Sequence, residues 1–274
     1  MSTSKDPAIH STVVTPAGLA EALRLLRERT PLVQCLTNIV VAQWTANVVL
    51  AAGGAPAMVD NPEEAGLFAG VASGVLVNTG TPYRETYQAM RVASHSAHEA
   101  GTPWVLDPVA AGGLPVRTAF ALEVLDNQPT IIRGNASEIS GLSGGAGGRG
   151  ADTTVAPEEV LGLAQGLARS VGCVVAVSGA VDHITDGEQV VRIHNGDPIM
   201  TRVTGVGCSL GALMAGFAGV AEPLLAASAA TALMCVAADN AVATTQGPGS
   251  FAVALLDQLA LVTPEELEQK VKLS

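Results

Sequence analysis

Aromatic side chains are almost absent from this sequence, which has two Trp, two Tyr and four Phe in 274 residues. Charged residues are also scarce, at 14% of the chain against a usual share of roughly 25%. A core must therefore be built from Ala, Val, Leu and Gly, which let elements pack at short distances. Because 48% of the residues are still hydrophobic, a disordered chain is excluded. We also expect apolar surface to be covered in a homo-oligomer.

Runs of Lys or Arg are absent, and the net charge is −11. This balance argues against a nucleic-acid partner and against binding to an anionic membrane. The first twelve residues lack the apolar segment of a signal peptide, so we expect a cytoplasmic protein. The cysteines form no C-x-x-C pair, which favours reduced thiols over a disulfide framework or a zinc site, and three of them are expected to fill the core. They are Cys35, Cys173, Cys208 and Cys235.

One segment, residues 223–245, is apolar enough to be considered as a membrane span. It is rich in Ala, Ser and Thr, and it contains Asp239 and Asn240, which would be costly in hydrocarbon. We therefore expect a buried helix of a globular protein.

Short apolar runs, each followed by turn residues and then by helical spacing, recur along the first two thirds of the chain. Thr15 and Pro16 are typical of a helix start before the first run, and residues 41–52 have helical spacing that stops at Gly53. The alternation of strand and helix predicts a mainly parallel sheet with helices on both faces. The predicted strands are residues 32–35, 55–59, 74–78, 104–106, 130–132 and 173–177.

The pattern changes after Ser178. Residues 183–185 and 189–194 are predicted to be strands joined by a tight turn at Asp186 and Gly187, which extends the sheet as a β-meander. From Gly207 onward the sequence is predicted to be helical. With no obvious linker, we expect one domain over residues 1–274. The glycine-rich segment 143–150 is expected to be a surface loop, because it lacks the Lys and Ser/Thr of a phosphate-binding P-loop.

Gly205 and Gly207 lie immediately before an apolar helix that starts near Cys208. Successive backbone N–H groups at a helix start are free, and the helix dipole adds positive potential there. This segment is therefore a candidate anion hole. A simple glycine-rich entry into a helix is the structural alternative.

Polar residues after the predicted strands are candidates for binding phosphate and metal. Arg133 is a planar donor that suits nucleotide phosphates, and it follows a strand at the edge where open α/β sheets bind ligands. Asp107 and Glu138 are hard oxygen ligands that suit Mg²⁺. An Arg–Glu ion pair with a capped helix would explain Arg133 and Glu138 without a ligand. A local hydrogen bond would likewise explain Ser178.

Two residues in the first third of the chain are candidates for contacting a small substrate. Asn38 can donate and accept a hydrogen bond, and Met58 offers a polarisable thioether that packs on rings. By itself, Met58 would be interpreted as a core residue. His95 and His98 have i, i+3 spacing, but no third ligand is near them in the sequence, so we expect exposed histidines on a helix.

Six motifs in order and spacing make the chain resemble the hydroxyethylthiazole kinases of thiamine salvage, a branch of the ribokinase-like fold. The motifs are PLVQCLTNIVV followed by TAN, GGAPAM, WVLDPVAAGG followed by Arg117 and Thr118, IIRGNASEI, AVSGAVDHITDG, and HNGDPIMTRVTGVGC.

The resemblance implies ATP-dependent phosphorylation of the hydroxyl of 4-methyl-5-(2-hydroxyethyl)thiazole, with Mg²⁺, by a homotrimer with active sites between subunits. It implies that Arg133, Ser178 and Asn135 bind ATP, and that Asp107 and Glu138 bind the metal. It places Met58, Gly205 and Asn38 at the thiazole. Cys208, with Gly205 and Gly207, would form the catalytic segment. A thiol at a helix start is expected to have a lowered pKa and could accept the proton of the substrate hydroxyl.

The sequence departs from the family pattern at two positions. GVGC replaces the more usual GTGC, and Gln34 stands where a His is common. Within the fold, a hydroxymethylpyrimidine kinase and a nicotinamide-hydrate dehydratase are alternatives, but both are expected to carry an aspartate in place of Cys208. A non-catalytic thiazole-binding protein is the alternative outside enzymes.

Overall fold

The computed structural model describes residues 13–144 and 157–274, and most of the predicted loop 143–150 lies outside them. Its strands are β1 (Leu32–Leu36), β2 (Ala55–Ala57), β3 (Gly74–Asn78), β4 (Trp104–Asp107), β5 (Ile131–Asn135), β6 (Val174–Ser178), β7 (Asp182–Thr185) and β8 (Val190–Ile193). Its α-helices are α1 (Pro16–Arg29), α2 (Ala42–Ala52), α3 (Ala65–Ala69), α4 (Arg84–Ala100), α5 (Pro115–Val124), α6 (Ala136–Leu142), α7 (Pro157–Val171), α8 (Val206–Ala218), α9 (Pro223–Val242), α10 (Pro248–Leu261) and α11 (Pro264–Lys270). Short 3₁₀ helices are η1 (Ile39–Val41), η2 (Leu125–Asn127) and η3 (Pro198–Arg202).

The strands form one sheet in the order β2-β1-β3-β4-β5-β6-β7-β8. Pairing is parallel from β2 to β6 and antiparallel from β6 to β8. This arrangement confirms the predicted α/β class, with a parallel sheet extended by a β-meander and a helical C-terminal part.

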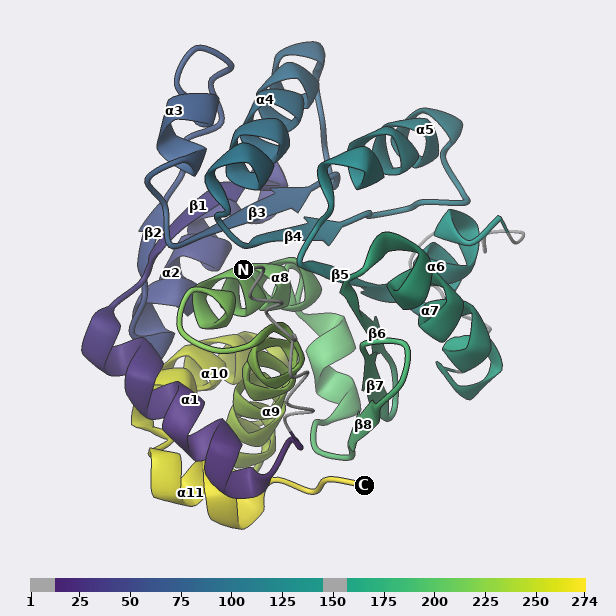
Figure 1. The fold of residues 1–274 in the computed structure, drawn as a ribbon. Helices are drawn as coiled ribbons and strands as arrows, with labels where there is room; N and C mark the ends of the chain where they lie inside the picture. The colour runs from purple at the N-terminus through teal and green to yellow at the C-terminus, as the bar shows by residue number, and fades with distance from the viewer. Residues whose placement is uncertain (1–12, 145–156) are drawn as a thin grey trace, which may run out of the picture.

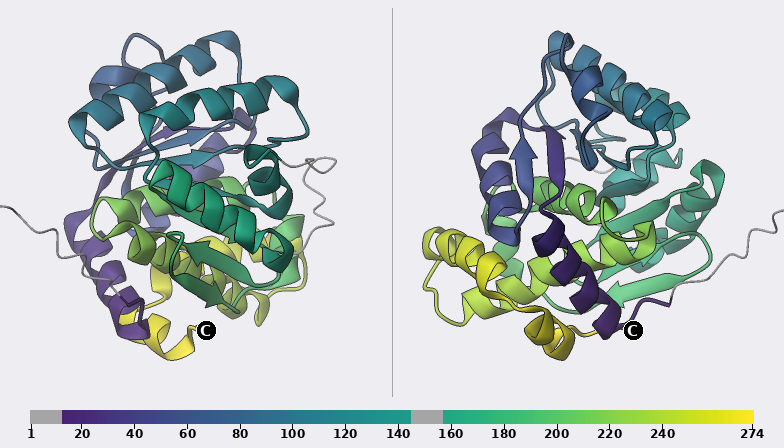
Figure 2. Two further views of the ribbon diagram at one scale, coloured as in Figure 1. Left: turned by 45° about the vertical axis from the view of Figure 1, so that its right-hand side comes forward. Right: turned by 60° about the vertical axis from the view of Figure 1, so that its left-hand side comes forward.

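Helices cover both faces of the sheet (Figure 1). The core on one face joins the sheet to α1, α2, α8, α9, α10 and α11. The core on the other face joins it to α3, α4, α5, α6 and α7. Figure 2 shows the same two layers from other sides. Side chains alternate between the faces, as a pleated strand requires: Val105 belongs to the first core, and Trp104 and Leu106 to the second.

Small residues let α8 lie directly against the sheet. A Cβ added to Gly74 on β3 would lie 2.0 Å from the carbonyl oxygen of Ala215 on α8, so only glycine fits there. The short-distance packing expected from a core poor in aromatics is therefore present. It places the first turn of α8 beside the ends of the central strands.

The helices α8, α9 and α10 are predominantly apolar. Among the described residues, α9 is the one helix long and apolar enough to cross a membrane, and 78% of its most apolar window is buried in the fold. It is thus the predicted buried helix. Cys35, Cys173 and Cys235 are buried, as predicted, whereas Cys208 is partly accessible.

The boundary after β5 corrects the sequence interpretation. Arg133 was expected to follow a strand of residues 130–132, but β5 runs to Asn135. The main chain of Arg133 pairs with that of Ala176 on β6. The guanidinium is therefore fixed to the rigid sheet instead of a loop.

Candidate active site

Polar residues gather where the parallel strands end. Asn38 follows β1, Asn78 ends β3, Asp107 ends β4 and Ser178 ends β6. Neighbouring parallel strands bring these ends to one edge, and the first turn of α8 lies against the same edge. This is the edge at which open α/β sheets bind ligands.

Arg133, within β5, links the ends of its two neighbouring strands, β4 and β6. Its Nη1 donates to Asp107 Oδ2 at 3.3 Å and its Nη2 donates to Ser178 Oγ at 3.1 Å. Burial opposes the charge of the guanidinium, but the carboxylates of Asp107 and Glu138 outweigh it and raise the pKa of Arg133. The charged guanidinium is therefore held in place by Asp107 on one side and Ser178 on the other.

Asp107 is fully buried, and burial raises its pKa to about 6 against the opposing charge of Arg133. Its Oδ2 accepts from Asn78 Nδ2 at 2.7 Å. Its Oδ1 has no hydrogen-bond partner among the described residues. Oδ2 of this carboxylate is thus held by hydrogen bonds, whereas Oδ1 has a lone pair that could bind a cation.

Glu138 caps the start of α6. Its Oε2 accepts from the N–H of Asn135, and Asn135 Oδ1 accepts from the N–H of Glu138, each at 2.9 Å. This capping box is the structural alternative that the sequence left open for Glu138. The ion pair of Arg133, however, is with Asp107. The Glu138 Oε1 also accepts from the N–H of Ala110 at 2.9 Å, where the backbone has a φ of 64°.

The start of α8 is an open helix end. Gly205 has a φ of 92°, and no side chain caps the helix. The first α8 hydrogen bond runs from the Ser209 N–H to the Gly205 carbonyl, so the N–H groups of residues 206–208 have no partner within the helix. A Cβ on Gly207 would lie 3.0 Å from Arg133 Nη2. The guanidinium therefore lies beside Gly207, in the first turn of α8.

Cys208 differs from its sequence-based expectation. Burial, followed by the charge of Asp107, raises the pKa of its thiol to about 11, although Arg133 and the amides of Asn78 and Asn38 act in the opposite direction. The expected lowered pKa is therefore wrong. Removal of the thiol from water beside a carboxylate disfavours the thiolate.

Asn78 is a site residue that the sequence interpretation missed. Besides its bond to Asp107, its Oδ1 accepts from the N–H of Gly80 at 2.9 Å. Asn38 is fixed in a similar way, since its Oδ1 accepts from Thr81 Oγ1 at 2.9 Å and from the N–H of Val40 at 3.0 Å. The signal for Asn78 was its position at the end of a fully apolar run.

Met58 follows the edge strand β2, next to the strand that leads to Asn38. Met58 is 39% exposed, so the interpretation as a core residue is wrong. The location at the ligand-binding edge is compatible with a contact to a small molecule.

A divalent cation fits the acidic residues of this edge. Among the described residues no three His, Cys, Asp or Glu side chains form a metal cluster, so a closed protein cage is not built here. Mg²⁺ instead uses one or two carboxylates together with water and substrate phosphates. The unpartnered oxygen of Asp107 suits this mode.

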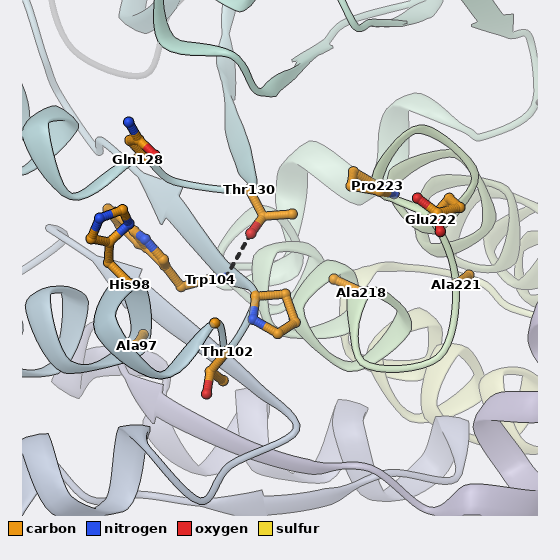
Figure 3. Close-up of a pocket in the computed structure, with 12 residues that line it drawn as sticks. Ala97, His98, Thr102, Trp104, Gln128, Thr130, Ala218, Ala221, Glu222 and Pro223 are labelled. Atoms are coloured by element: carbon orange, nitrogen blue, oxygen red, sulfur yellow. Dashed lines mark hydrogen bonds between the residues drawn. The ribbon is translucent and has the colours of Figure 1, made fainter. Parts of the chain in front are cut away.

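A cavity of about 380 Å³ lies elsewhere, near the amino end of β4 (Figure 3). It is lined by the start of β4, the end of α4 with His98, and the connection between α8 and α9 with Glu222. None of the predicted site residues lines it. His95 and His98 are exposed on α4, as expected.

The model of the hydroxyethylthiazole kinase family matches residues 23–265. A hydroxyethylthiazole kinase from Clavibacter sepedonicus is 59% identical over 262 residues, with 95% of each chain covered. One from Cutibacterium acnes is 55% identical over 255 residues, with 92% of each chain covered.

Solved structures agree with this assignment. That of a hydroxyethylthiazole kinase from Pyrococcus horikoshii superposes with a TM-score of 0.87 at 38% identity, covering 93% of this chain and 98% of its own. A pyridoxal kinase from Staphylococcus aureus, solved with AMP-PCP and pyridoxal, has a TM-score of 0.57 at 15% identity, covering 76% of this chain and 87% of its own. The latter shares the fold alone. The chain belongs to the hydroxyethylthiazole kinase family.

Proposed function

We propose that this protein transfers the γ-phosphoryl group of ATP to the hydroxyl of 4-methyl-5-(2-hydroxyethyl)thiazole, as its family membership indicates. The observation that carries the proposal is the position of Arg133, which is paired with Asp107 and lies beside Gly207 in the first turn of α8. Phosphoryl transfer depends mainly on positioning and on stabilising charge, and this arrangement supplies both.

Arg133, Ser178 and Asn135 are assigned to the nucleotide. The guanidinium of Arg133 can donate to phosphate oxygens with the geometry that suits them. Ser178 Oγ already accepts from Arg133 and keeps its own proton to donate. The amides of residues 206–208, with glycines at 205 and 207, stabilise negative charge on the group being transferred.

Asp107 and Glu138 are assigned to Mg²⁺. When bound, the ion neutralises negative charge on the phosphate oxygens. Asp107 offers its free oxygen, while Glu138 offers the remaining lone pairs of a carboxylate that also holds the main chain at Ala110 and Asn135. Glu138 thus combines a structural role with the proposed one.

The thiazole is assigned to Asn38, Met58 and Gly205, with its hydroxyl toward Cys208. Asn38 Nδ2 can donate, since the Oδ1 of the same amide is occupied by Thr81 and Val40. Cys208 can accept the proton of the hydroxyl only in its thiolate form. Because burial raises the pKa of the thiol to about 11, few molecules carry the thiolate at neutral pH, and we assign proton acceptance a modest share of the rate enhancement.

A homotrimer with its sites between subunits is part of the proposal. Apolar side chains are exposed on η1, α2 and α10, which belong to neighbouring parts of the same layer. Examples are Ile39, Leu50 and Val253, at 63%, 59% and 64% exposure. Covering them in an assembly would remove apolar area from water. We retain the predictions of a cytoplasmic location and of no nucleic-acid or membrane partner, which rest on the sequence.

A panel of small alcohols tests the activity. ADP release would be measured with hydroxyethylthiazole, hydroxymethylpyrimidine, pyridoxal and no acceptor, and the phosphorylated product would be identified by mass. We expect turnover with the thiazole to exceed that with the other acceptors. Thiazole binding without ADP release would indicate a binding protein. Faster turnover of the pyrimidine would indicate a different kinase of the same fold.

A further inference from the structure

Gln34 is a polar side chain in the fully buried part of β1. It is 0% exposed, and its neighbours in register are Ala57 on β2 and Val75 on β3. Alternation along the strand places it on the same face as Leu36, which packs in the core with α3 and α4. A polar group in such a place destabilises the fold unless hydrogen bonds compensate for its desolvation.

The hydrogen bonds of Gln34 all lead to one segment. Its Nε2 donates to the carbonyl of Val59 at 2.9 Å and to the carbonyl of Ala65 at 3.1 Å. Its Oε1 has no hydrogen-bond partner among the described residues. The amide group is therefore used as a double donor that ties together the two ends of residues 59–65.

This segment has few other restraints at its first end. It follows β2, a three-residue strand at the edge of the sheet with β1 as its neighbour. Its second half is organised by Asn61, whose carbonyl accepts from the N–H groups of Glu64 and Ala65. The Gln34 bond to Val59 holds the first half, immediately after Met58.

We propose that Gln34 is a positioning residue for thiazole binding, because it anchors the main chain beside Met58. The inference rests on the proposed contact between Met58 and the thiazole. Gln34 itself is buried and does not touch the ligand. Its loss should let the Met58 segment move, which weakens thiazole binding while Arg133, Asp107 and the start of α8 stay in place.

Steady-state kinetics of variants with single and double substitutions test this proposal. Gln34→Leu fills similar space without a donor, and Gln34→Met serves the same purpose if the Leu variant does not fold. We expect the KM for thiazole to rise by about fivefold to tenfold, as for the loss of a hydrogen bond that fixes a binding group. The kcat and the KM for ATP should remain near those of the wild type. Gln34→His should restore most of the affinity, since an imidazole N–H can donate.

The matched control is Ser228→Ala on α9. Ser228 is also 0% exposed and has a hydroxyl without a partner among the described residues. Its removal should leave both KM values unchanged. Thermal unfolding of every variant would show whether the folded state is retained.

A double-mutant cycle with Met58→Ala separates the possible outcomes. If Gln34 acts through Met58, the double variant should have nearly the same KM for thiazole as Met58→Ala alone. Additive effects, or equal losses in the ATP and thiazole parameters, would overturn the proposal. If Met58→Ala has no effect on the KM for thiazole, both the Met58 contact and this inference are wrong. The ATP-dependent activity of the wild type, measured first, stands independently of each of these results.

Discussion

Arg133 and Asp107 form a buried ion pair between the neighbouring strands β5 and β4, with Arg133 Nη1 at 3.3 Å from Asp107 Oδ2. The pairing of Ile132 with Leu106 one residue earlier brings the two side chains to the same level of the sheet. The pair thus connects the group assigned to ATP with the group assigned to the metal. In the ion pair, each side chain also compensates part of the free-energy cost of burying the charge of the other.

Gly207→Ala should weaken ATP binding. The added methyl group would lie 3.0 Å from Arg133 Nη2, so the guanidinium must shift by a few tenths of an ångström from the position that its bonds to Asp107 and Ser178 fix. We expect the KM for ATP to rise by about tenfold, as for a weakened charge-assisted hydrogen bond. The control is Gly166→Ala in α7, where a Cβ would have no neighbour within 4 Å. Equal behaviour of the two variants would remove Gly207 from the nucleotide site.

Asp107→Ala and Glu138→Ala should each lower kcat far more than they raise the KM for thiazole. We expect losses of at least about 10²-fold, comparable to removing a preorganised electrostatic group. The measurement is kcat over a Mg²⁺ titration, in which the half-saturating Mg²⁺ concentration should also rise. Near-normal rates at saturating Mg²⁺ and ATP would assign both carboxylates to structure alone. For Glu138 that structure is the cap of α6.

Cys208→Ala should slow the reaction without abolishing it, by less than about 10²-fold, the lower end of a general-base contribution. Cys208→Asp should be at least as active as the Ala variant, because Arg133 offsets the added charge beside Asp107. Since the pKa of the Cys208 thiol is raised to about 11, its thiolate fraction is small at pH 6 and rises with pH, so the difference in kcat between wild type and the Ala variant should widen from pH 6 to pH 9. Complete inactivity of both variants would require another role for Cys208, such as covalent participation.

Asp182→Asn should stabilise the fold at neutral pH. Burial raises the pKa of Asp182 to about 6, so the folded state binds more protons than the unfolded state between about pH 4 and pH 6. The ionised carboxylate therefore costs stability above pH 6, and this cost disappears as the pH falls toward 4. The shift of about two units sets an upper bound of about 3 kcal/mol on the gain at pH 7. Asn can still accept from the N–H of Gly179, as Asp182 does.

Urea denaturation of wild type and Asp182→Asn at pH 4, 5, 6 and 7 measures this difference. The free energies of unfolding should converge as the pH is lowered. If Asp182→Asn raised the free energy of unfolding equally at every pH, or lowered it at pH 7, burial would be contradicted as the cause of the raised Asp182 pKa.

The proposed assembly predicts a mass three times the chain mass of 27.6 kDa in sedimentation at micromolar concentration. Leu50→Asp on α2 should weaken the assembly, because it places a charge among the exposed apolar residues of that layer. Val116→Asp on α5, in the opposite layer, is the matched control at 70% exposure. A wild-type monomer would contradict the trimer.

Local pattern in the sequence was sufficient for much of the fold. Thr15 caps α1 through a 3.1 Å bond from the N–H of Gly18, and Leu19, Leu23 and Leu26 are buried as their spacing predicts. Helix starts and apolar periods depend on residues a few positions apart, so they can be predicted from the chain alone. The alternation of such elements then restricts the parallel sheet to few arrangements.

Tertiary structure decided the chemical state of the site. The partner of Arg133 is Asp107, 26 residues away, and the raised pKa of Cys208 reflects burial beside that same carboxylate. The roles of Asn78 and Gln34 likewise became visible through hydrogen bonds to Asp107 and to Val59. Burial and electrostatic interactions depend on distances between segments that are remote in the chain. Composition and spacing determine which residues reach the edge of the sheet, whereas the packing of α8 against the strands determines what those residues do there.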